Sequence, residues 1–504
     1  MRRIPTILAT TFLVLLLINA CGNSPEDPVA RGLATITAEH LLADVTTLAG
    51  PEYSGRLPGD VGYEKAAAWA ATRFQELGLD PGGDDDGYQQ HLPIEYNVIQ
   101  GTPTLEVTSP DGQTAPARLG PDFVCRGFTG SGTVDAEVVF AGYGLSVPER
   151  GYDDYADLDV MDKIVLVFKP NPGWCPDTLG WDWASSTPRA KATTARDHGA
   201  KAILWVSPPR GGDMANLRGP IGSVLHGPAA HLADMPHLEI SLALADRMLG
   251  DSGETLRLQA LIDSLETSKS MVTSSRAALD VQAVYEPERE TSNVVAVLRG
   301  SDSELTEEAL VIGAHLDHVG RQSPDFYFPG ANDNASGSAA VLRLAEAFSQ
   351  AGRAPRRSVV FVLFAGEESG LIGARFHAEN PVFPAERSTA MFNFDCVACG
   401  DSIRVGGGRD YPELWNLARE FDSQQHAMMV EQTWGGGGAD ATPFHEAGLR
   451  TLYWVTTDGY ANLHAPGDTP ETLNGQLYEQ LVKLAFRTAW TVADAPQDTV
   501  LARR

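Results

Sequence analysis

The sequence predicts an α/β fold, in which a mostly parallel central sheet is covered by helices on both faces and is interrupted by a β-rich insert. From residue 291 onwards, short apolar runs alternate with helix-like segments, as in "ALVIGAHLD", "SGSAAVLRLAEAFSQAG" and "SVVFVLFAGEE". This alternation is typical of a parallel sheet with both faces covered. Between about residues 100 and 275, runs such as "AEVVFAGYG" and "DKIVLVFKP" are instead separated by Gly, Pro and Asp turns, which predicts short strands.

The segment before the insert, residues 37–78, predicts two helices. The second begins after Asp60, a good N-cap residue, and stops at Gly78. We therefore expect an α/β domain that is split by the insert. The expected divisions are 36–99 for its first part, 100–275 for the insert and 276–495 for its second part.

Composition restricts the possible partners. The chain has 504 residues, enough for two domains with separate cores. Its 66 acidic and 38 basic residues give a net charge of −28. Such an excess of negative charge argues against nucleic acid or an anionic membrane face as a partner.

The N-terminus predicts export. Two arginines precede an apolar run over residues 7–18, which is too short to span a bilayer as a mature helix, and Cys21 follows. This pattern resembles a bacterial lipoprotein signal, with residues 1–20 removed, Cys21 acylated and residues 21–35 serving as a tether. We expect a protein that is lipid-anchored to the outer membrane or cell surface. Secretion without an anchor is the alternative.

Four cysteines follow Cys21, an even number in an oxidising compartment. Three pairings are possible, and we favour Cys125 with Cys175 and Cys396 with Cys399. The CxxC spacing of the second pair could instead provide half of a zinc site, but the sequence has no second CxxC.

Polar residues gather where the predicted strands of the second part end. They are His315, Asp317, Asp333, Glu367, Glu368, Asp395, His464 and Asp468. In open α/β sheets ligands bind at the carboxyl ends of the strands, so these side chains are expected at one edge. Histidines together with several carboxylates suit zinc, and this many carboxylates would allow two ions to share a bridging ligand. Zinc would also explain the adjacent Glu367 and Glu368, because like charges so close need a compensating cation.

Five motifs in chain order carry a resemblance to a known family. "GAHLDHVG", "GANDNASG", "FAGEESGLIGA", "FNFD" and "HAPGDTPE" together resemble the co-catalytic two-zinc aminopeptidases, metallo-exopeptidases related to glutamate carboxypeptidase and the transferrin receptor ectodomain. The resemblance covers about residues 36–490, and the insert is similar to a protease-associated domain. It implies the zinc-exopeptidase fold, a three-layer α/β/α sandwich with a mostly parallel sheet.

The resemblance also implies two zinc ions per chain and a role for each site residue. Its ligand set is His315 and Asp395 for one zinc, Glu368 and His464 for the other, and Asp333 as the bridge. Glu367 is then the general base, and Asp317 orients His315. The family has a cis peptide bond after the bridging aspartate, which predicts one between Asp333 and Asn334.

Other residues near the motifs match the family less well. His318, His377 and His445 match no family ligand and are interpreted as structural or surface residues. Asp440 matches a family aspartate whose usual Ser and frequent His neighbours are both alanine here.

One departure concerns the oxyanion. Many relatives have Tyr immediately before the final histidine, where its hydroxyl steadies the oxyanion, but this chain has Leu463. Tyr460 lies close enough in sequence to be a substitute.

The expected activity is release of N-terminal residues from peptides. A carboxypeptidase or dipeptidase of the glutamate-carboxypeptidase type is an alternative, and so is a single-zinc cyclising aminoacyltransferase. A non-catalytic surface binding module is the third, but such proteins typically lose ligands or the base, and the chain retains all of these residues.

Overall fold

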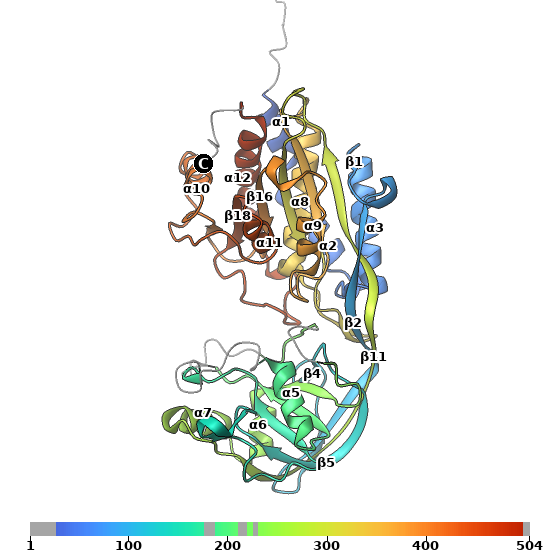
Figure 1. Cartoon of the computed structure of the whole chain (residues 1–504), viewed down its shortest axis with the longest axis vertical. Helices are drawn as coiled ribbons and strands as arrows, with labels where there is room; N and C mark the ends of the chain where they lie inside the picture. Colours follow the sequence, from blue (N-terminus) through green and yellow to red (C-terminus); the bar gives the residue numbers. More distant parts are fainter. Residues whose placement is uncertain (1–26, 176–186, 210–218, 225–229, 497–504) are drawn as a thin grey trace, which may run out of the picture.

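The chain forms two lobes that are joined by two long strands, as the computed structural model shows (Figure 1). The structure describes residues 27–175, 187–209, 219–224 and 230–496. The predicted signal segment and Cys21 lie outside the described residues. Among the helices that are described, none is both long and apolar enough to cross a membrane.

The main lobe is built on a mostly parallel sheet. In spatial order its strands are β17 (Ile403–Gly406), β18 (Thr451–Thr456), β16 (Ser388–Phe394), β12 (Ala309–His315), β15 (Ser358–Phe364), β11 (Met271–Leu298) and β1 (Asp80–Pro81). β12 pairs in parallel with both β15 and β16, and β16 pairs in parallel with β18. The flanking strands β17 and β11 are antiparallel to their neighbours. A hairpin of β13 (Arg321–Ser323) and β14 (Phe326–Tyr327) lies outside this sheet.

Helices cover both faces of this sheet, so the predicted three-layer α/β/α architecture is confirmed (Figure 1). One face packs against α1 (Pro28–Thr35), α2 (Ala38–Leu48), α3 (Val61–Glu76), α8 (Gly337–Ser349), α10 (Pro412–Ser423) and α12 (Gly475–Asp494). The other packs against α9 (Ile372–Glu379) and α11 (Ala441–Glu446). Successive strand residues enter opposite layers, as Phe361 and Val362 do, because side chains alternate along a strand.

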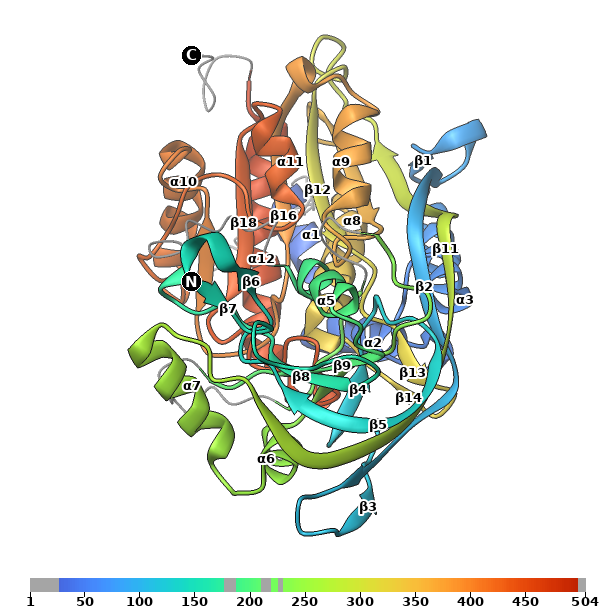
Figure 2. The same cartoon turned by 60° about the horizontal axis from the view of Figure 1, so that its bottom comes forward.

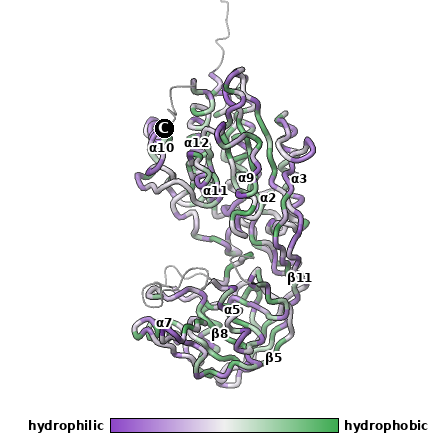
Figure 3. The backbone as a smooth tube through the Cα atoms, in the orientation of Figure 1, coloured by the Kyte–Doolittle hydropathy of each residue, from purple (hydrophilic) through white to green (hydrophobic). Residues whose placement is uncertain are grey.

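The insert lobe has its own sheet and its own cores. Its parallel strands, in order, are β5 (Gly132–Phe140), β8 (Ile164–Phe168), β9 (Ala202–Val206) and β10 (His237–Ile240), followed by antiparallel β4 (Phe123–Cys125). Its helices are α5 (Pro188–Asp197), α6 (Leu242–Leu249) and α7 (Glu254–Leu265), and its short strands are β3 (Thr114–Pro116), β6 (Ser146–Val147) and β7 (Tyr152–Asp153). Figure 3 shows hydrophobic residues along the strands inside each lobe. The lobe is therefore an α/β unit with parallel strands, and its relation to a protease-associated domain stays a prediction.

Two antiparallel strands, β2 (Gln89–Thr108) and β11, run from one lobe into the other (Figure 2). β11 pairs with β15 in the main lobe and with β5 in the insert lobe. The domain boundaries expected near residues 99 and 275 fall inside these strands. The sheet is consequently continuous across the junction, and those boundaries stay a prediction.

The predicted disulfides are wrong. Cys125, Cys175, Cys396 and Cys399 are all buried free thiols in the structure. Cys125 and Cys175 are part of the apolar core of the insert lobe. Cys396 packs in an apolar cluster beside β18, whereas the sulfur of Cys399 faces the carbonyl of Thr472 at 3.9 Å. The two sulfurs of the CxxC segment thus meet different surroundings, although they are close in sequence.

Candidate metal centre

The candidate residues come together where the parallel strands end. β12 ends at His315, Asp395 follows β16, and Glu367 and Glu368 follow β15. These strands are parallel neighbours, so their carboxyl ends meet at one edge of the sheet. Asp333 comes from the helical turn η7 (Ala331–Ser336), which leads into α8.

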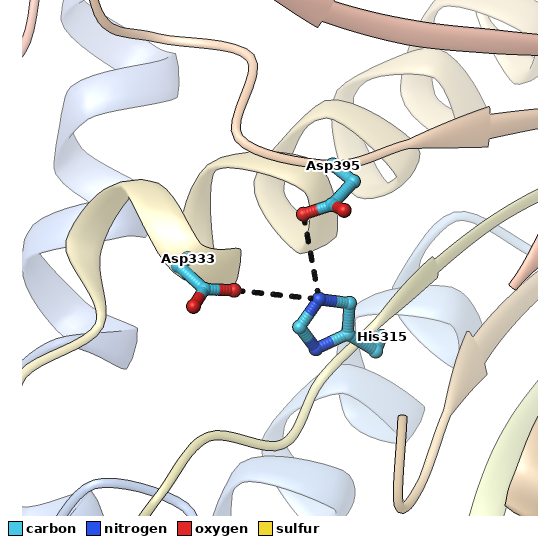
Figure 4. Close-up of side chains that lie close together, drawn as sticks. All are labelled: His315, Asp333 and Asp395. Carbon is cyan, nitrogen blue, oxygen red and sulfur yellow. Dashed lines mark ion pairs between the residues drawn. The ribbon is translucent and has the colours of Figure 1, made fainter. Parts of the chain in front are cut away.

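His315, Asp333 and Asp395 form a first cluster (Figure 4). The Nε2 atom of His315 lies 3.5 Å from Oδ1 of Asp333 and 3.5 Å from Oδ1 of Asp395. All three side chains are buried. This is the set that the resemblance assigns to one ion together with the bridging residue.

A second cluster surrounds the other oxygen of Asp333. The Nε2 atom of His464 lies 2.7 Å from Oε2 of Glu368 and 3.3 Å from Oδ2 of Asp333. His318 approaches the same pair, with Nδ1 at 3.1 Å from Oε1 of Glu368 and 3.6 Å from Oδ2 of Asp333. Asp333 therefore presents one oxygen to each cluster, which is the geometry that a bridging carboxylate requires.

These residues fit a pair of zinc ions. Imidazole nitrogens and carboxylate oxygens are common zinc ligands. Oδ2 of Asp333 and Oδ1 of Asp395 are buried, and no described residue donates a hydrogen bond to either. Such acceptors need a partner, and a cation would supply one. Nδ1 of His315 lies 3.2 Å from the carbonyl oxygen of Asp317, which leaves Nε2 to face the cluster.

His318 is predicted to be a structural or surface residue, and it does not lie at the surface. Its side chain is fully buried inside the second cluster and contacts Glu368 directly. The sequence signal was present, because His318 follows His315 and Asp317 in the same motif. Matching only the family ligands excluded it.

Asp317 contacts His315 differently from the expectation. The carbonyl oxygen of Asp317 is closer to His315 than its carboxylate, which lies 3.7 Å from Nδ1. The carboxylate instead accepts hydrogen bonds from the backbone N–H groups of Glu367, at 3.2 Å, and Glu368, at 3.3 Å. Burial raises the pKa of Asp317 to about 6, against the opposing charge of His315. Asp317 therefore fixes the turn that carries the two glutamates.

The loop that carries Asp333 is held by a second carboxylate. The two oxygens of Asp468 accept hydrogen bonds from the backbone N–H groups of Asn332, at 2.9 Å, and Asp333, at 3.0 Å. The peptide bond between Asp333 and Asn334 is cis, as the resemblance predicts. Asp468 thus links the Asp333 turn to the loop that carries His464.

Arg56 holds the loops around the site through hydrogen bonds to their backbone, a role that the sequence did not predict. Its guanidinium group is fully buried and donates hydrogen bonds of 2.7 to 2.9 Å to four carbonyl oxygens, those of Leu48, Leu316, Pro329 and Gly330. Burial lowers the pKa of Arg56 to about 10, although nearby Asp333 and Asp468 oppose this shift. Nothing in the sequence around Arg56 shows what its side chain contacts.

The two adjacent glutamates have opposite electrostatic environments. Burial raises the pKa of Glu367 well above its usual value; His315 opposes this, while Glu368 and Asp440 add to it. Burial acts in the same direction on Glu368, but His464 and His318 outweigh it and lower the pKa of Glu368 well below its usual value. Neighbouring carboxyl groups whose environments push their pKa values apart are typical of groups with different chemical roles.

Two tyrosines connect the first cluster to the surface. The Tyr453 hydroxyl donates a 2.5 Å hydrogen bond to Oδ2 of Asp395 and lies 2.7 Å from the Tyr460 hydroxyl. Tyr460 is 39% exposed, whereas Tyr453 is buried. Leu463 packs against Tyr453 in a small apolar cluster. The sequence suggested Tyr460 but gave no sign of Tyr453, which resembled an ordinary core residue of β18.

The remaining candidates differ in position. Asp440 is fully buried; burial raises its pKa well above the usual value, His315 opposes the shift, and Asp317 adds to it. His377 is buried on α9 and forms a 2.9 Å contact with Gln90, which agrees with a structural role. His445 is partly exposed and contacts Tyr411 instead of the cluster.

Known peptidases resemble this chain in sequence and in fold. Residues 293–489 match the family model described as Peptidase family M28. A probable leucine aminopeptidase of Trichophyton verrucosum is 27% identical over 198 residues, which cover 38% of this chain and 56% of that protein. The chain thus spans about half the length of the curated relatives that it matches.

Two solved structures share the fold over nearly the whole chain. A peptidase M28 precursor from Shewanella amazonensis SB2B has a TM-score of 0.65 at 20% identity, with 95% of this chain and 97% of that one covered. BSAP, a zinc aminopeptidase from Bacillus subtilis, has a TM-score of 0.59 at 18% identity, with 92% and 98% covered. The chain therefore has the fold of the M28 aminopeptidases, and its residues 293–489 match that peptidase family in sequence.

Proposed function

We propose that this protein is a zinc-dependent aminopeptidase that binds two zinc ions per chain and releases N-terminal residues from peptides. The observation that carries the proposal is the position of Asp333, whose two carboxylate oxygens face two separate histidine–carboxylate clusters. The family match and the zinc aminopeptidase fold of a structural neighbour support the same activity.

In this proposal the two clusters hold the metal. His315 and Asp395 would hold one zinc, Glu368 and His464 would hold the other, and Asp333 would offer one oxygen to each. When bound, such ions lower the pKa of a water molecule and polarise the substrate carbonyl. His318 keeps Glu368 in place through its 3.1 Å contact, and Asp317 fixes the turn on which Glu368 lies.

Glu367 is the proposed general base. It accepts the proton of the attacking water on a carboxylate oxygen and returns it to the leaving amine. Its backbone N–H group is held by the carboxylate of Asp317, so the side chain starts from a fixed position. The hydroxyl of Tyr460 is the proposed donor to the oxyanion in place of the tyrosine that Leu463 replaces. Because the Tyr453 proton goes to Asp395, the Tyr460 proton points to the Tyr453 oxygen in the structure, and it would turn from there to the oxyanion when substrate is bound.

The test is hydrolysis of a panel of aminoacyl-p-nitroanilides by the purified mature chain. Release that a chelator abolishes and zinc restores, and that Glu367→Gln abolishes while zinc content stays at two per chain, would support the proposal. Two bound zincs without release would redirect it to carboxypeptidase or dipeptidase substrates. No metal and no release would refute a catalytic role and favour a binding module.

We also propose export and lipid anchoring through Cys21, on the basis of the apolar run over residues 7–18 and the cysteine that follows it. Labelled palmitate should be incorporated into the parent chain in a bacterial host and not into Cys21→Ser. Equal labelling of both would refute the anchor.

A further inference from the structure

The insert lobe contacts the backbone of a proposed metal ligand. The backbone N–H group of Gly222 donates a 2.8 Å hydrogen bond to the carbonyl oxygen of His464. Gly222 belongs to the described segment 219–224, which lies between β9 and β10 of the insert lobe. The contact therefore joins the insert lobe to the loop that carries His464.

The same segment is packed tightly against the main lobe. Val224 and Val124 of the insert lobe form an apolar cluster with Val319 and Phe328, which lie between His315 and Asp333 in the sequence. A Cβ atom on Gly222 would lie 3.0 Å from Phe328 and closer still to Cγ2 of Val319. Real Cβ atoms essentially never come within 3.0 Å of another heavy atom. A side chain at position 222 would therefore force Val319 or the Gly222 segment to shift.

A second contact aligns the two lobes independently. The side chain of Gln322, in the β13–β14 hairpin, accepts a 2.6 Å hydrogen bond from the N–H group of Cys125 and donates a 3.1 Å hydrogen bond to its carbonyl. This pair holds the insert lobe against the main lobe. These two hydrogen bonds do not involve His464, whose carbonyl oxygen accepts the separate hydrogen bond from Gly222.

His464 needs external support. Its φ angle of 54° lies in the left-handed region, which is costly for a residue with a side chain. Its ring must nevertheless reach Glu368 and Asp333 at 2.7 and 3.3 Å. A hydrogen bond to the carbonyl of the same residue restricts the backbone rotation that would move this ring away.

We propose that Gly222 is a positioning residue for His464, so that the insert lobe helps to build the metal site, an inference that rests on the proposed two-zinc function. Groups that orient a metal ligand typically change metal affinity by 10–100-fold when they are removed. Gly222→Ala should push the segment away from Val319, break the hydrogen bond to His464 and weaken the zinc that His464 holds.

The experiment is calorimetric titration of zinc into the metal-free mature chain, which gives the number of ions and the affinity of each. We expect Gly222→Ala to lower the affinity for one of the two zinc ions by about 10-fold or more and to leave the affinity for the other unchanged. Gly219→Ala is the matched control, because a Cβ there meets nothing within 4 Å. Val319→Ala combined with Gly222→Ala removes the nearest clash and should recover much of the lost affinity, which also keeps the test valid if Gly222→Ala alone folds poorly.

A double-mutant comparison separates positioning from general destabilisation. Adding Gly222→Ala to His464→Ala should weaken zinc binding little further, because the two changes act through one ligand. Unchanged affinity for both ions in Gly222→Ala would overturn this inference and leave the proposed function intact. Absence of zinc binding by the parent chain would overturn the proposed function itself.

Discussion

Replacement of Arg56 by Met should destabilise the metal-free protein by about 3 kcal/mol. The four carbonyl oxygens that the guanidinium group contacts would lose hydrogen bonds to a charged donor, at roughly 1.5 kcal/mol each, or about 6 kcal/mol in all. Against this, burial lowers the pKa of Arg56 from 12.5 to about 10. That shift means that the buried charge itself costs about 3 kcal/mol, which the substitution would recover. The lost hydrogen bonds outweigh the relieved charge.

The assay is urea unfolding of the metal-free chain, followed by tryptophan fluorescence and circular dichroism. Arg276→Met is the matched control: Arg276 is half exposed and pairs with Asp135 at 2.9 Å, so its loss should cost less than about 1 kcal/mol. Arg56→Lys keeps the positive charge but not the forked set of N–H donors, so its loss of stability should lie between that of Arg56→Met and that of Arg276→Met. An Arg56→Met protein that unfolds at the same urea concentration as the parent chain would refute the reasoning, because it would mean that the buried charge costs as much as its hydrogen bonds return.

Three other outcomes are expected. Glu367→Gln should lower the rate of aminoacyl-p-nitroanilide hydrolysis by roughly 10²–10⁴-fold with zinc content unchanged, whereas Glu368→Gln should lose zinc; equal zinc loss in both would contradict the division of roles. Burial lowers the pKa of His377 from 6.5 to about 4, so between these pH values the unfolded chain binds a proton that the folded chain does not. Stability should therefore be full above pH 6.5 and fall, by on the order of 3 kcal/mol, as the pH drops to 4. His377→Phe should remove this part of the pH dependence of unfolding, and an unchanged pH dependence would refute the assignment. Thiol titration of the denatured, unreduced Cys21→Ser chain should give four thiols, and two would indicate a disulfide that the structure lacks.

The sequence predicted the fold, and it predicted that the candidate residues meet at one edge of the sheet, because both follow from local patterns. Mostly apolar strands such as β12 and β15 are buried along their whole length, and such runs between amphipathic helices indicate a sheet covered on both faces. Strand ends then place residues such as His315 and Asp395 at one edge without any knowledge of the loops.

The missed features all depend on contacts between distant segments. Arg56 meets carbonyls that lie some 260 residues later in the chain, and Gly222 meets His464. No periodicity or motif in the sequence signals either contact. The disulfide prediction failed for a related reason: spacing brings Cys396 and Cys399 close along the chain but does not set the direction of their side chains.

The pairing of β2 with β11 has a consequence for how the insert is attached. The chain leaves the main lobe along β2 and returns along β11, and facing residues such as Ile94 and Arg289 are cross-strand partners. The insert is therefore an extension of a hairpin tip, so its entry and exit points are adjacent. A turn of a few residues closing the ribbon at this pair would restore a simple hairpin and leave the strand order of the main sheet unchanged. A chain shortened at this pair is therefore expected to keep the main sheet and to lose the contact between Gly222 and His464.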